Sequence, residues 1–228
     1  MTEFVFVHAI GRPGRDAWPV QAAHPTARFL TRRGFVEEQL PSEFAIDDEG
    51  HWIADHTERS SIVVGHSWSA VAVLASVLAG GSPARAAVLI EPPATFVAPD
   101  EPVVRQHVAD LAPAFVAGLS LEDFRARFSA GMGFELPLPD SQAAVRSLEL
   151  LRRHRPPWET SLTPGDLPSL RIPVAVITGG WNPLYEVIAD ALSDFPLVSR
   201  HTIPGGGHRP QDTQQFNEFL TTWSDPGS

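Results

Sequence analysis

Short apolar runs alternate with helix-like segments along most of the chain. Several runs are rich in β-branched and aliphatic residues and end at glycine, proline or polar residues, which is typical of buried strands. The predicted strands cover residues 4–7, 61–65, 86–90, 173–178 and 197–203, and a further short strand is predicted at 35–40.

The segments between these strands carry apolar residues at helical spacing or are bounded by helix stop signals. They predict helices over 25–34, 48–58, 71–79, 141–153, 184–193 and 216–223, and the apolar positions of 103–111 and 121–128 follow the same spacing. Since strands alternate with helices, we expect an α/β fold with a mostly parallel central sheet flanked by helices.

Residues from about 100 to 165 differ from the rest, because no strand-like run occurs there and prolines interrupt the helical pattern. This block lies between two predicted strands, so we expect it to pack on the carboxyl edge of the sheet. The predicted organisation is a core domain formed by 1–99 and 166–228, with an inserted helical cap, or lid, at 100–165. We call residues 100–165 the cap segment.

Composition narrows the possible chemistry. The chain has 228 residues, of which 43% are hydrophobic, enough for one well-buried domain. A net charge of −10 disfavours nucleic acid as a partner, because phosphate binding depends on basic surfaces. No apolar run approaches the roughly eighteen residues of a membrane helix, and no signal-peptide pattern is present. We therefore expect a cytoplasmic protein that does not bind membranes.

Two residue types are missing altogether. Cysteine is absent, which excludes disulfides and thiolate chemistry. All 17 basic residues are arginine, so Schiff-base and lysine-nucleophile mechanisms are excluded as well. The nine histidines do not show the spacing of a metal site on one helix.

The run that begins at Ile62 breaks into Gly65-His66-Ser67-Trp68-Ser69 and continues directly into a helix-like segment. A strand that stops at a glycine, presents one serine and turns into a helix describes a nucleophile elbow. Such a tight turn needs small residues two positions before and after the nucleophile, and Gly65 and Ser69 meet that need. The alternative is an ordinary Gly-Ser turn, since the chain contains 17 glycines.

A serine hydroxyl needs a base to remove its proton, and that base is usually a histidine held by a third group. His208 follows three consecutive glycines after the last predicted strand, where the backbone can bend sharply. The alternative is a surface histidine on a flexible loop. Candidate functional residues follow predicted strands, and ligands of parallel sheets bind outside the carboxyl ends of strands. These residues are His8, Ser67, Glu91, Asn182 and His208.

At these motifs the sequence resembles the α/β-hydrolase fold superfamily, which includes serine esterases and lipases. The matching segments are Val7-His8-Ala9-Ile10-Gly11, the Gly65–Ser69 elbow, Ile177–Pro183 and Gly207-His208. Their order is that of the superfamily, over nearly the whole chain. The resemblance implies a fold reduced at the N-terminus, with the first two of the usual eight strands missing or much reduced.

By this resemblance Ser67 is the nucleophile and His208 the general base. The backbone N–H groups of Trp68 and Ile10 would form the oxyanion hole. The superfamily usually has His-Gly where this chain has His8-Ala9, so the path of the early loop can differ. His66 and Trp181 are possible substrate-binding residues.

The residue that orients His208 stays open. The resemblance predicts an aspartate in the loop after Ile177, where Asn182 stands instead. The superfamily sometimes places its acid after the strand that follows the elbow, which is the position of Glu91. We favour Glu91; the alternatives are that Asn182 orients the histidine, or that hydrolysis has been lost.

The expected function is hydrolysis of a small, largely apolar ester, lactone or thioester through an acyl-enzyme on Ser67. This chemistry requires no cofactor, and the expected partner is a small-molecule substrate. Two alternatives remain on the same fold. One is a cofactor-free lyase or cyclase in which His208 acts without acylation of Ser67, and the other is a non-catalytic small-molecule binder.

Overall fold

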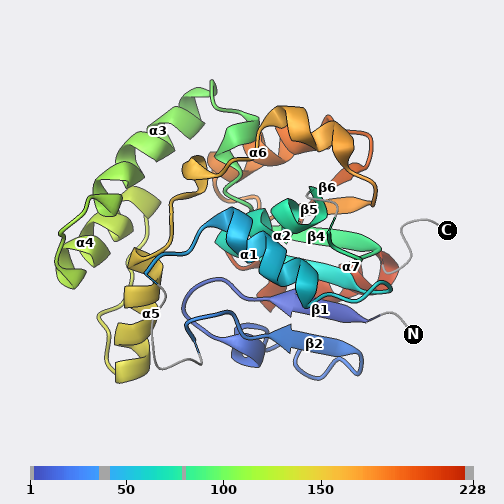
Figure 1. Cartoon of the computed structure of the whole chain (residues 1–228), viewed down its shortest axis with the longest axis horizontal. Helices are drawn as coiled ribbons and strands as arrows, with labels where there is room; N and C mark the ends of the chain where they lie inside the picture. The colour runs from blue at the N-terminus through green and yellow to red at the C-terminus, as the bar shows by residue number, and fades with distance from the viewer. Residues whose placement is uncertain (1–2, 36–41, 79–80, 224–228) are drawn as a thin grey trace.

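The computed structural model describes residues 3–35, 42–78 and 81–223. At its centre six strands form one sheet in the order β2-β1-β3-β4-β5-β6, with every neighbouring pair parallel (Figure 1). The fold is thus the predicted α/β arrangement. The strands are β1 (Phe4–Val7), β2 (Ala27–Leu30), β3 (Ile62–His66), β4 (Ala86–Ile90), β5 (Val174–Thr178) and β6 (Val198–Thr202).

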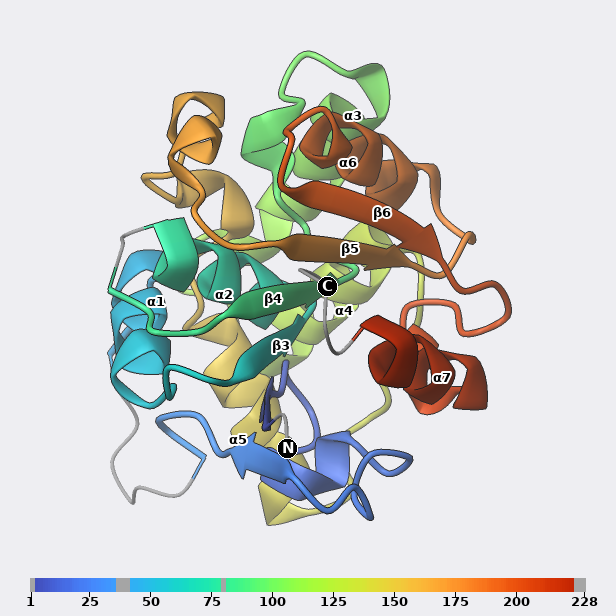
Figure 2. The same ribbon diagram turned by 90° about the vertical axis from the view of Figure 1, so that its right-hand side faces the viewer.

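The four central strands β1, β3, β4 and β5 are buried on both faces, which is why they are almost continuously apolar. In β1, Val5 and Val7 pack on one face, and Phe4 and Phe6 on the other. The first face is covered by α1, α2 and α6, and the second by α7 (Figure 2). These helices are α1 (Ile46–Asp55), α2 (Trp68–Leu78), α6 (Pro183–Ser193) and α7 (Gln214–Trp223).

The cap segment carries α3 (Pro102–Leu111), α4 (Leu121–Met132) and α5 (Gln142–Arg152). In Figure 1 these helices stand beside the edge of the sheet toward which the strand arrows point. Part of the segment has its own apolar cluster, formed around Ala114, Phe124, Leu148 and Leu151. No helix in the described ranges is long and apolar enough to cross a membrane.

The predicted helix at 25–34 is wrong, because its centre is strand β2, which pairs with β1 from Phe4↔Ala27 to Val7↔Leu30. Four residues with little alternation carry no strong strand signal of their own. The strand forms because it completes the hydrogen bonds of β1 and because the Phe29 ring stacks on that of Phe6, 5.3 Å away. The strand predicted at 35–40 lies, apart from Phe35, outside the described residues.

Helices α1 and α2 approach each other closely at Gly50. A Cβ atom at this position would lie 2.9 Å from the Ala75 Cβ and 3.1 Å from the Ser76 backbone nitrogen. Neither atom belongs to a flexible side chain, so the helices would have to separate to accept one. The glycine therefore holds α1 against the helix that follows Ser67.

We expect Gly50→Ala to lower the free energy of unfolding by about 1–2 kcal/mol, since even one extra carbon overpacks this contact. In an unconstrained helix the same change would raise stability by roughly 0.5–1 kcal/mol, so the sign is diagnostic. Urea denaturation measures the effect. His51→Ala, on an exposed position of α1, is the control and should leave stability nearly unchanged. A more stable Gly50→Ala protein would contradict the close approach.

Candidate active site

Ser67 occupies the sharp turn between β3 and α2. Its φ is 54°, in the left-handed region that non-glycine residues rarely adopt. The turn is held by two backbone hydrogen bonds, from Ser67 N–H to the Ile90 carbonyl (2.8 Å) and from Ala70 N–H to the Ser67 carbonyl (2.8 Å). A strained, well-supported backbone of this kind is typical of a functional position.

The small residues around Ser67 have separate physical reasons. A Cβ on Gly65 would lie 2.7 Å from the Ser69 carbonyl oxygen and 2.8 Å from the Ala70 Cα, so only glycine fits beneath the turn. Ser69 is buried, and its hydroxyl donates to the His8 carbonyl at 2.7 Å. The serine that replaces the usual second glycine therefore joins the elbow to the early loop.

His208 contacts both partners expected of a base. Its Nε2 lies 3.1 Å from Ser67 Oγ, and its Nδ1 lies 3.3 Å from Glu91 Oε2. The backbone of His208 is held from behind, because His66 Nε2–H donates to the His208 carbonyl at 2.7 Å. Ser67, His208 and Glu91 therefore form a continuous hydrogen-bonded line.

Glu91 is fully buried and, with a φ of 47°, sits in a left-handed turn like that of Ser67. Besides His208 it accepts hydrogen bonds from Gly179 N–H (2.6 Å) and from Trp181 Nε1–H (2.9 Å). A Cβ on Gly179 would lie 2.0 Å from the Gly207 carbonyl oxygen, so the glycine lets the Gly179 loop meet the loop of His208. These bonds fix the carboxylate in one orientation.

Asn182 is placed elsewhere. It is the residue before α6, and its Oδ1 accepts a hydrogen bond from Leu184 N–H at 3.0 Å, which caps the helix. Within the described residues it makes no hydrogen bond to His208. Of the two candidates for orienting the histidine, only Glu91 is thus in hydrogen-bond contact with it.

Trp68 and Ile10 line the same cavity as Ser67. Trp68 is the first residue of α2, so its backbone N–H belongs to the helix turn that has no intrahelical acceptor. Ile10 lies in the loop after β1. Both positions are compatible with the predicted donors.

The cavity above Ser67 has a volume of about 270 Å³. Its walls come from the loops of the sheet and from the cap segment, and most of the lining side chains are apolar. They include Ile10, Leu111, Phe115, Phe128, Phe134, Leu136 and Leu151. The volume lies just under the roughly 300–1,000 Å³ of sites for drug-sized ligands, which indicates a small ligand.

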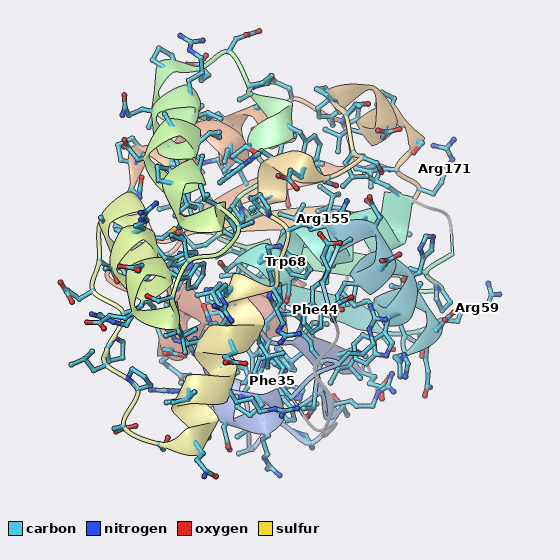
Figure 3. The ribbon with its side chains drawn as sticks, turned by 60° about the vertical axis from the view of Figure 1, so that its left-hand side comes forward. Phe35, Phe44, Arg59, Trp68, Arg155 and Arg171 are labelled. Carbon is cyan, nitrogen blue, oxygen red and sulfur yellow. The ribbon has the colours of Figure 1, made fainter. Side chains whose placement is uncertain are left out.

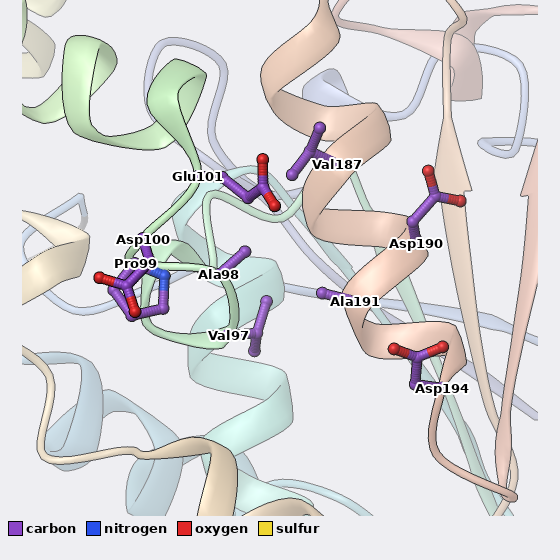
Figure 4. Close-up of a pocket in the computed structure, with 9 residues that line it drawn as sticks. All are labelled: Val97, Ala98, Pro99, Asp100, Glu101, Val187, Asp190, Ala191 and Asp194. Atoms are coloured by element: carbon purple, nitrogen blue, oxygen red, sulfur yellow. The ribbon is translucent and has the colours of Figure 1, made fainter.

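A second, more open groove lies between residues 97–101 and α6, with a volume of about 500 Å³ (Figure 4). Its polar side chains are Asp100, Glu101, Asp190 and Asp194. It offers neither a nucleophile nor a histidine, and the described part of the chain holds no cluster suited to a metal ion. Of these two, the smaller cavity is the one lined by Ser67 and His208.

The two residues expected to contact substrate, His66 and Trp181, each make a hydrogen bond inside the protein. His66 lines the cavity, but its Nε2–H is committed to the His208 carbonyl. Trp181 is 39% exposed and directs its indole N–H at Glu91, so it supports the carboxylate. The sequence did not predict the hydrogen bonds of Trp181 and Gly179 to Glu91, although both residues lie in the segment Ile177–Pro183 that resembles the superfamily.

Tyr185, on α6, was also missed. It lines the cavity and its ring centre lies 5.2 Å from that of His208. Burial, and then the charge of Glu91, raise the pKa of the phenol, so Tyr185 stays neutral. Its place on the apolar face of α6 resembles ordinary core packing and gave no signal in the sequence.

Three buried histidines near the site are neutral. Burial first, and then Arg32, lower the pKa of His8 to about 3. Burial also holds the pKa of His66 and His154 well below its usual range, reinforced by the neighbouring His208 and Arg209 side chains at His66 and by Arg32 at His154. All three bind a proton more readily in the unfolded chain.

We therefore expect the protein to lose stability as the pH falls below about 6.5, where the unfolded chain takes up these protons and the native state does not. From pH 6.5 to 5 the free energy of unfolding should fall by about 1–2 kcal/mol for each histidine. Urea denaturation across this range tests the effect. His154→Gln should remove one proton from the dependence. A flat profile would contradict the neutral assignment.

Comparisons with known proteins address the family and the fold. The model of the "Alpha/beta hydrolase family" matches residues 4–220, while no curated protein matches at a significant level. Among solved structures, the carboxylesterase CesB from Bacillus subtilis has a TM-score of 0.64 and 14% identity, over 98% of this chain and 82% of that chain. The esterase RhEst1 from a Rhodococcus species has a TM-score of 0.58 and 17% identity, over 98% and 90%.

A third structure, described among novel epoxide hydrolases in metagenomes from hot environments, has a TM-score of 0.68 and 17% identity, over 100% of this chain and 91% of that chain. At these identities the structural likeness shows the fold alone. The family match spans nearly the whole sequence and includes the elbow and the His208 loop. The chain belongs to the alpha/beta hydrolase family.

Proposed function

We propose that this protein is a serine hydrolase of small, largely apolar esters, lactones or thioesters. The observation that carries the proposal is the hydrogen-bonded line from Ser67 through His208 to Glu91, which begins in an apolar cavity. A nucleophile, a base and an orienting group in this order are the components of acyl transfer by a serine enzyme.

In the first step Ser67 Oγ attacks the substrate carbonyl while His208 Nε2, 3.1 Å away, takes the hydroxyl proton. The C–O or C–S bond to the leaving group then breaks, and the histidine returns the proton to that group. A water molecule, deprotonated by the same nitrogen, releases the acid and restores Ser67. One imidazole thus serves both halves of the reaction.

Negative charge develops on the carbonyl oxygen in each tetrahedral intermediate. The backbone N–H groups of Trp68 and Ile10 are the proposed donors to it, and removal of one such donor typically costs 10²–10³ in kcat. The free first-turn amide of α2 supports Trp68 in this role, and the helix dipole favours negative charge at the same place.

Glu91 keeps the His208 proton on Nδ1 and stabilises the imidazolium that forms during attack. Its two further donors, Gly179 and Trp181, leave the carboxylate little freedom to turn away. Asn182 is left with a structural task at the start of α6. The acid of this site would then follow β4 instead of β5.

Residues 100–165 are proposed to act as the cap that sets substrate preference. Leu111, Phe115, Phe128 and Leu136 come from this segment and line the cavity with apolar surface. Within the described residues, hydrogen bonds already occupy Trp68 Nε1–H and His66 Nε2–H, two polar groups at the cavity. A compact apolar acyl or alcohol group suits such walls, and two of the structures with this fold are described as esterases.

A fluorophosphonate should label Ser67 covalently, because its phosphorus is attacked by the activated hydroxyl. Peptide mass spectrometry identifies the site, and we expect Ser67→Ala to abolish labelling. His208→Ala should slow it by about 10²–10³-fold, since the base is lost. Ser76→Ala is the matched control, because the hydroxyl of this buried α2 serine donates to the Val73 carbonyl, and labelling should persist. A folded protein with unlabelled Ser67 would refute the acyl-enzyme mechanism.

Glu91→Gln and Asn182→Ala should have opposite phenotypes. The amide in Glu91→Gln favours the wrong histidine tautomer, so kcat on an aryl ester should fall on the order of 10³-fold or more. Asn182→Ala removes a helix cap and should cost about 1 kcal/mol of stability with kcat within threefold. Steady-state kinetics and thermal unfolding on both variants check this. A minor loss in Glu91→Gln, or a large loss of kcat in Asn182→Ala, would overturn the assignment of Glu91.

A further inference from the structure

A buried arginine lies behind the proposed oxyanion hole. Arg32, which follows β2, is fully buried, and its Nε donates to Glu49 Oε1 of α1 at 2.9 Å. Its Nη1 has no hydrogen-bond partner among the described residues. Burial of an ion pair costs several kcal/mol per ion, and apolar residues often serve stability equally well. The contacts of the Arg32 guanidinium and backbone indicate a role beyond stability.

On one side the guanidinium holds Trp68, the residue after the nucleophile. Arg32 Cζ lies over the indole at 4.7 Å from the ring centre, a favourable cation–π distance. Arg32 Nη2 donates to His154 Nε2 at 2.7 Å, and the His154 ring meets the indole edge-on at 4.5 Å. Trp68 Nε1–H in turn donates to the Arg155 carbonyl at 2.9 Å, and Figure 3 shows Trp68 and Arg155 together beside α5.

On the other side Arg32 holds the early loop. Its backbone N–H donates to His8 Nε2 at 3.1 Å, and the His8 carbonyl accepts the hydrogen bond from Ser69. His8 Nδ1–H donates to the Ala9 carbonyl at 2.6 Å, immediately before Ile10. The same residue thus contacts the supports of both proposed oxyanion donors, Trp68 and Ile10.

We propose that Arg32, held by Glu49, is a positioning residue that aligns the two backbone donors of the oxyanion hole. The inference rests on the proposed function. Arg32 is not among the residues that line the cavity, so it acts through Trp68 and His8 and not on substrate. Donors aimed at the transition state depend on sub-ångström placement, and a shift of about 1 Å can cost 10²-fold in rate.

Arg33 is a built-in control for this idea. It pairs with the same carboxylate, Glu49, at 3.4 Å, but its side chain is 39% exposed. Within the described residues it makes no hydrogen bond or ion pair to His8, Trp68 or His154. Substitution of Arg33 therefore removes an ion pair with Glu49 but leaves the contacts of Arg32 with His8, Trp68 and His154 in place.

The test compares Arg32→Lys and Arg32→Met with Arg33→Lys and Arg33→Met on an aryl ester, well below the melting temperature of each variant. We expect kcat to fall about tenfold in Arg32→Lys and 10–100-fold in Arg32→Met, with KM within threefold. The Arg33 variants should stay within twofold in both constants. Lysine keeps the charge but cannot span Glu49 and His154 with a planar fork.

Inhibitor binding separates positioning from a purely structural role. A trifluoromethyl ketone forms a tetrahedral adduct that places an oxyanion in the hole, and its affinity should fall in parallel with kcat. The corresponding secondary alcohol fills the cavity without an oxyanion, and its affinity should stay unchanged. If Arg32 only stabilises the fold, the melting temperature falls while kcat and the ratio of the two affinities in folded protein keep their wild-type values. That result would overturn the proposal.

The test also covers Arg32 variants that fail to fold and a wild-type protein without activity. If neither Arg32 variant folds, Trp68→Phe takes their place, since it weakens the cation–π contact and removes the bond to Arg155. A loss of kcat of at least fivefold at constant KM then supports the proposal, and an unchanged kcat overturns it. Wild-type protein that neither hydrolyses esters nor labels at Ser67 refutes the proposed function, and the inference falls with it. Active wild type with unaffected Arg32 variants refutes the inference alone.

Discussion

The site depends on two adjacent strands that end in strained turns. β3 and β4 pair up to His66↔Ile90, and the next residue of each, Ser67 and Glu91, has a positive φ. Each such residue costs on the order of 1–3 kcal/mol. The sheet supplies the restraint, because Ser67 N–H still bonds the Ile90 carbonyl and Glu91 N–H bonds the Ile177 carbonyl, both at 2.8 Å. The two side chains reach opposite nitrogens of the same imidazole only because the backbone departs from strand geometry there.

The loop after β5 is joined to Glu91 by hydrogen bonds. The carboxylate reaches across to this loop and accepts from Gly179 N–H and Trp181 Nε1–H. The loop therefore supplies donors to a carboxylate instead of a carboxylate of its own. Asn182, in the same loop, caps α6.

The sequence predicted those features that have a local signal. β1 and β4 match their predicted bounds, because burial on both faces makes them continuous apolar runs between polar or proline-marked ends. The helix predicted at 25–34 was wrong, because the strand character of β2 comes from pairing with β1 and not from its own four residues. Glycines mark the elbow and the His208 loop in the sequence, because a larger residue would clash there. The contact of Arg32 with His154 joins residues 122 positions apart, and no local pattern announces it.

His154 also gives the cap segment a fixed attachment to the core. It stands just after α5, forms a parallel β-bridge with Phe44, and stacks on that ring at 4.7 Å. The neighbouring backbone is tied as well, since Arg155 N–H donates to the Phe44 carbonyl at 2.8 Å. The segment of His154 and Arg155 therefore contacts the Trp68 indole and also forms part of the cavity wall. Leu111 of α3 and Phe128 of α4 line the cavity, whereas His154 and Arg155 line it and also contact the Trp68 side chain. A substitution at 154 or 155 would therefore alter the cavity wall and the surroundings of Trp68 together.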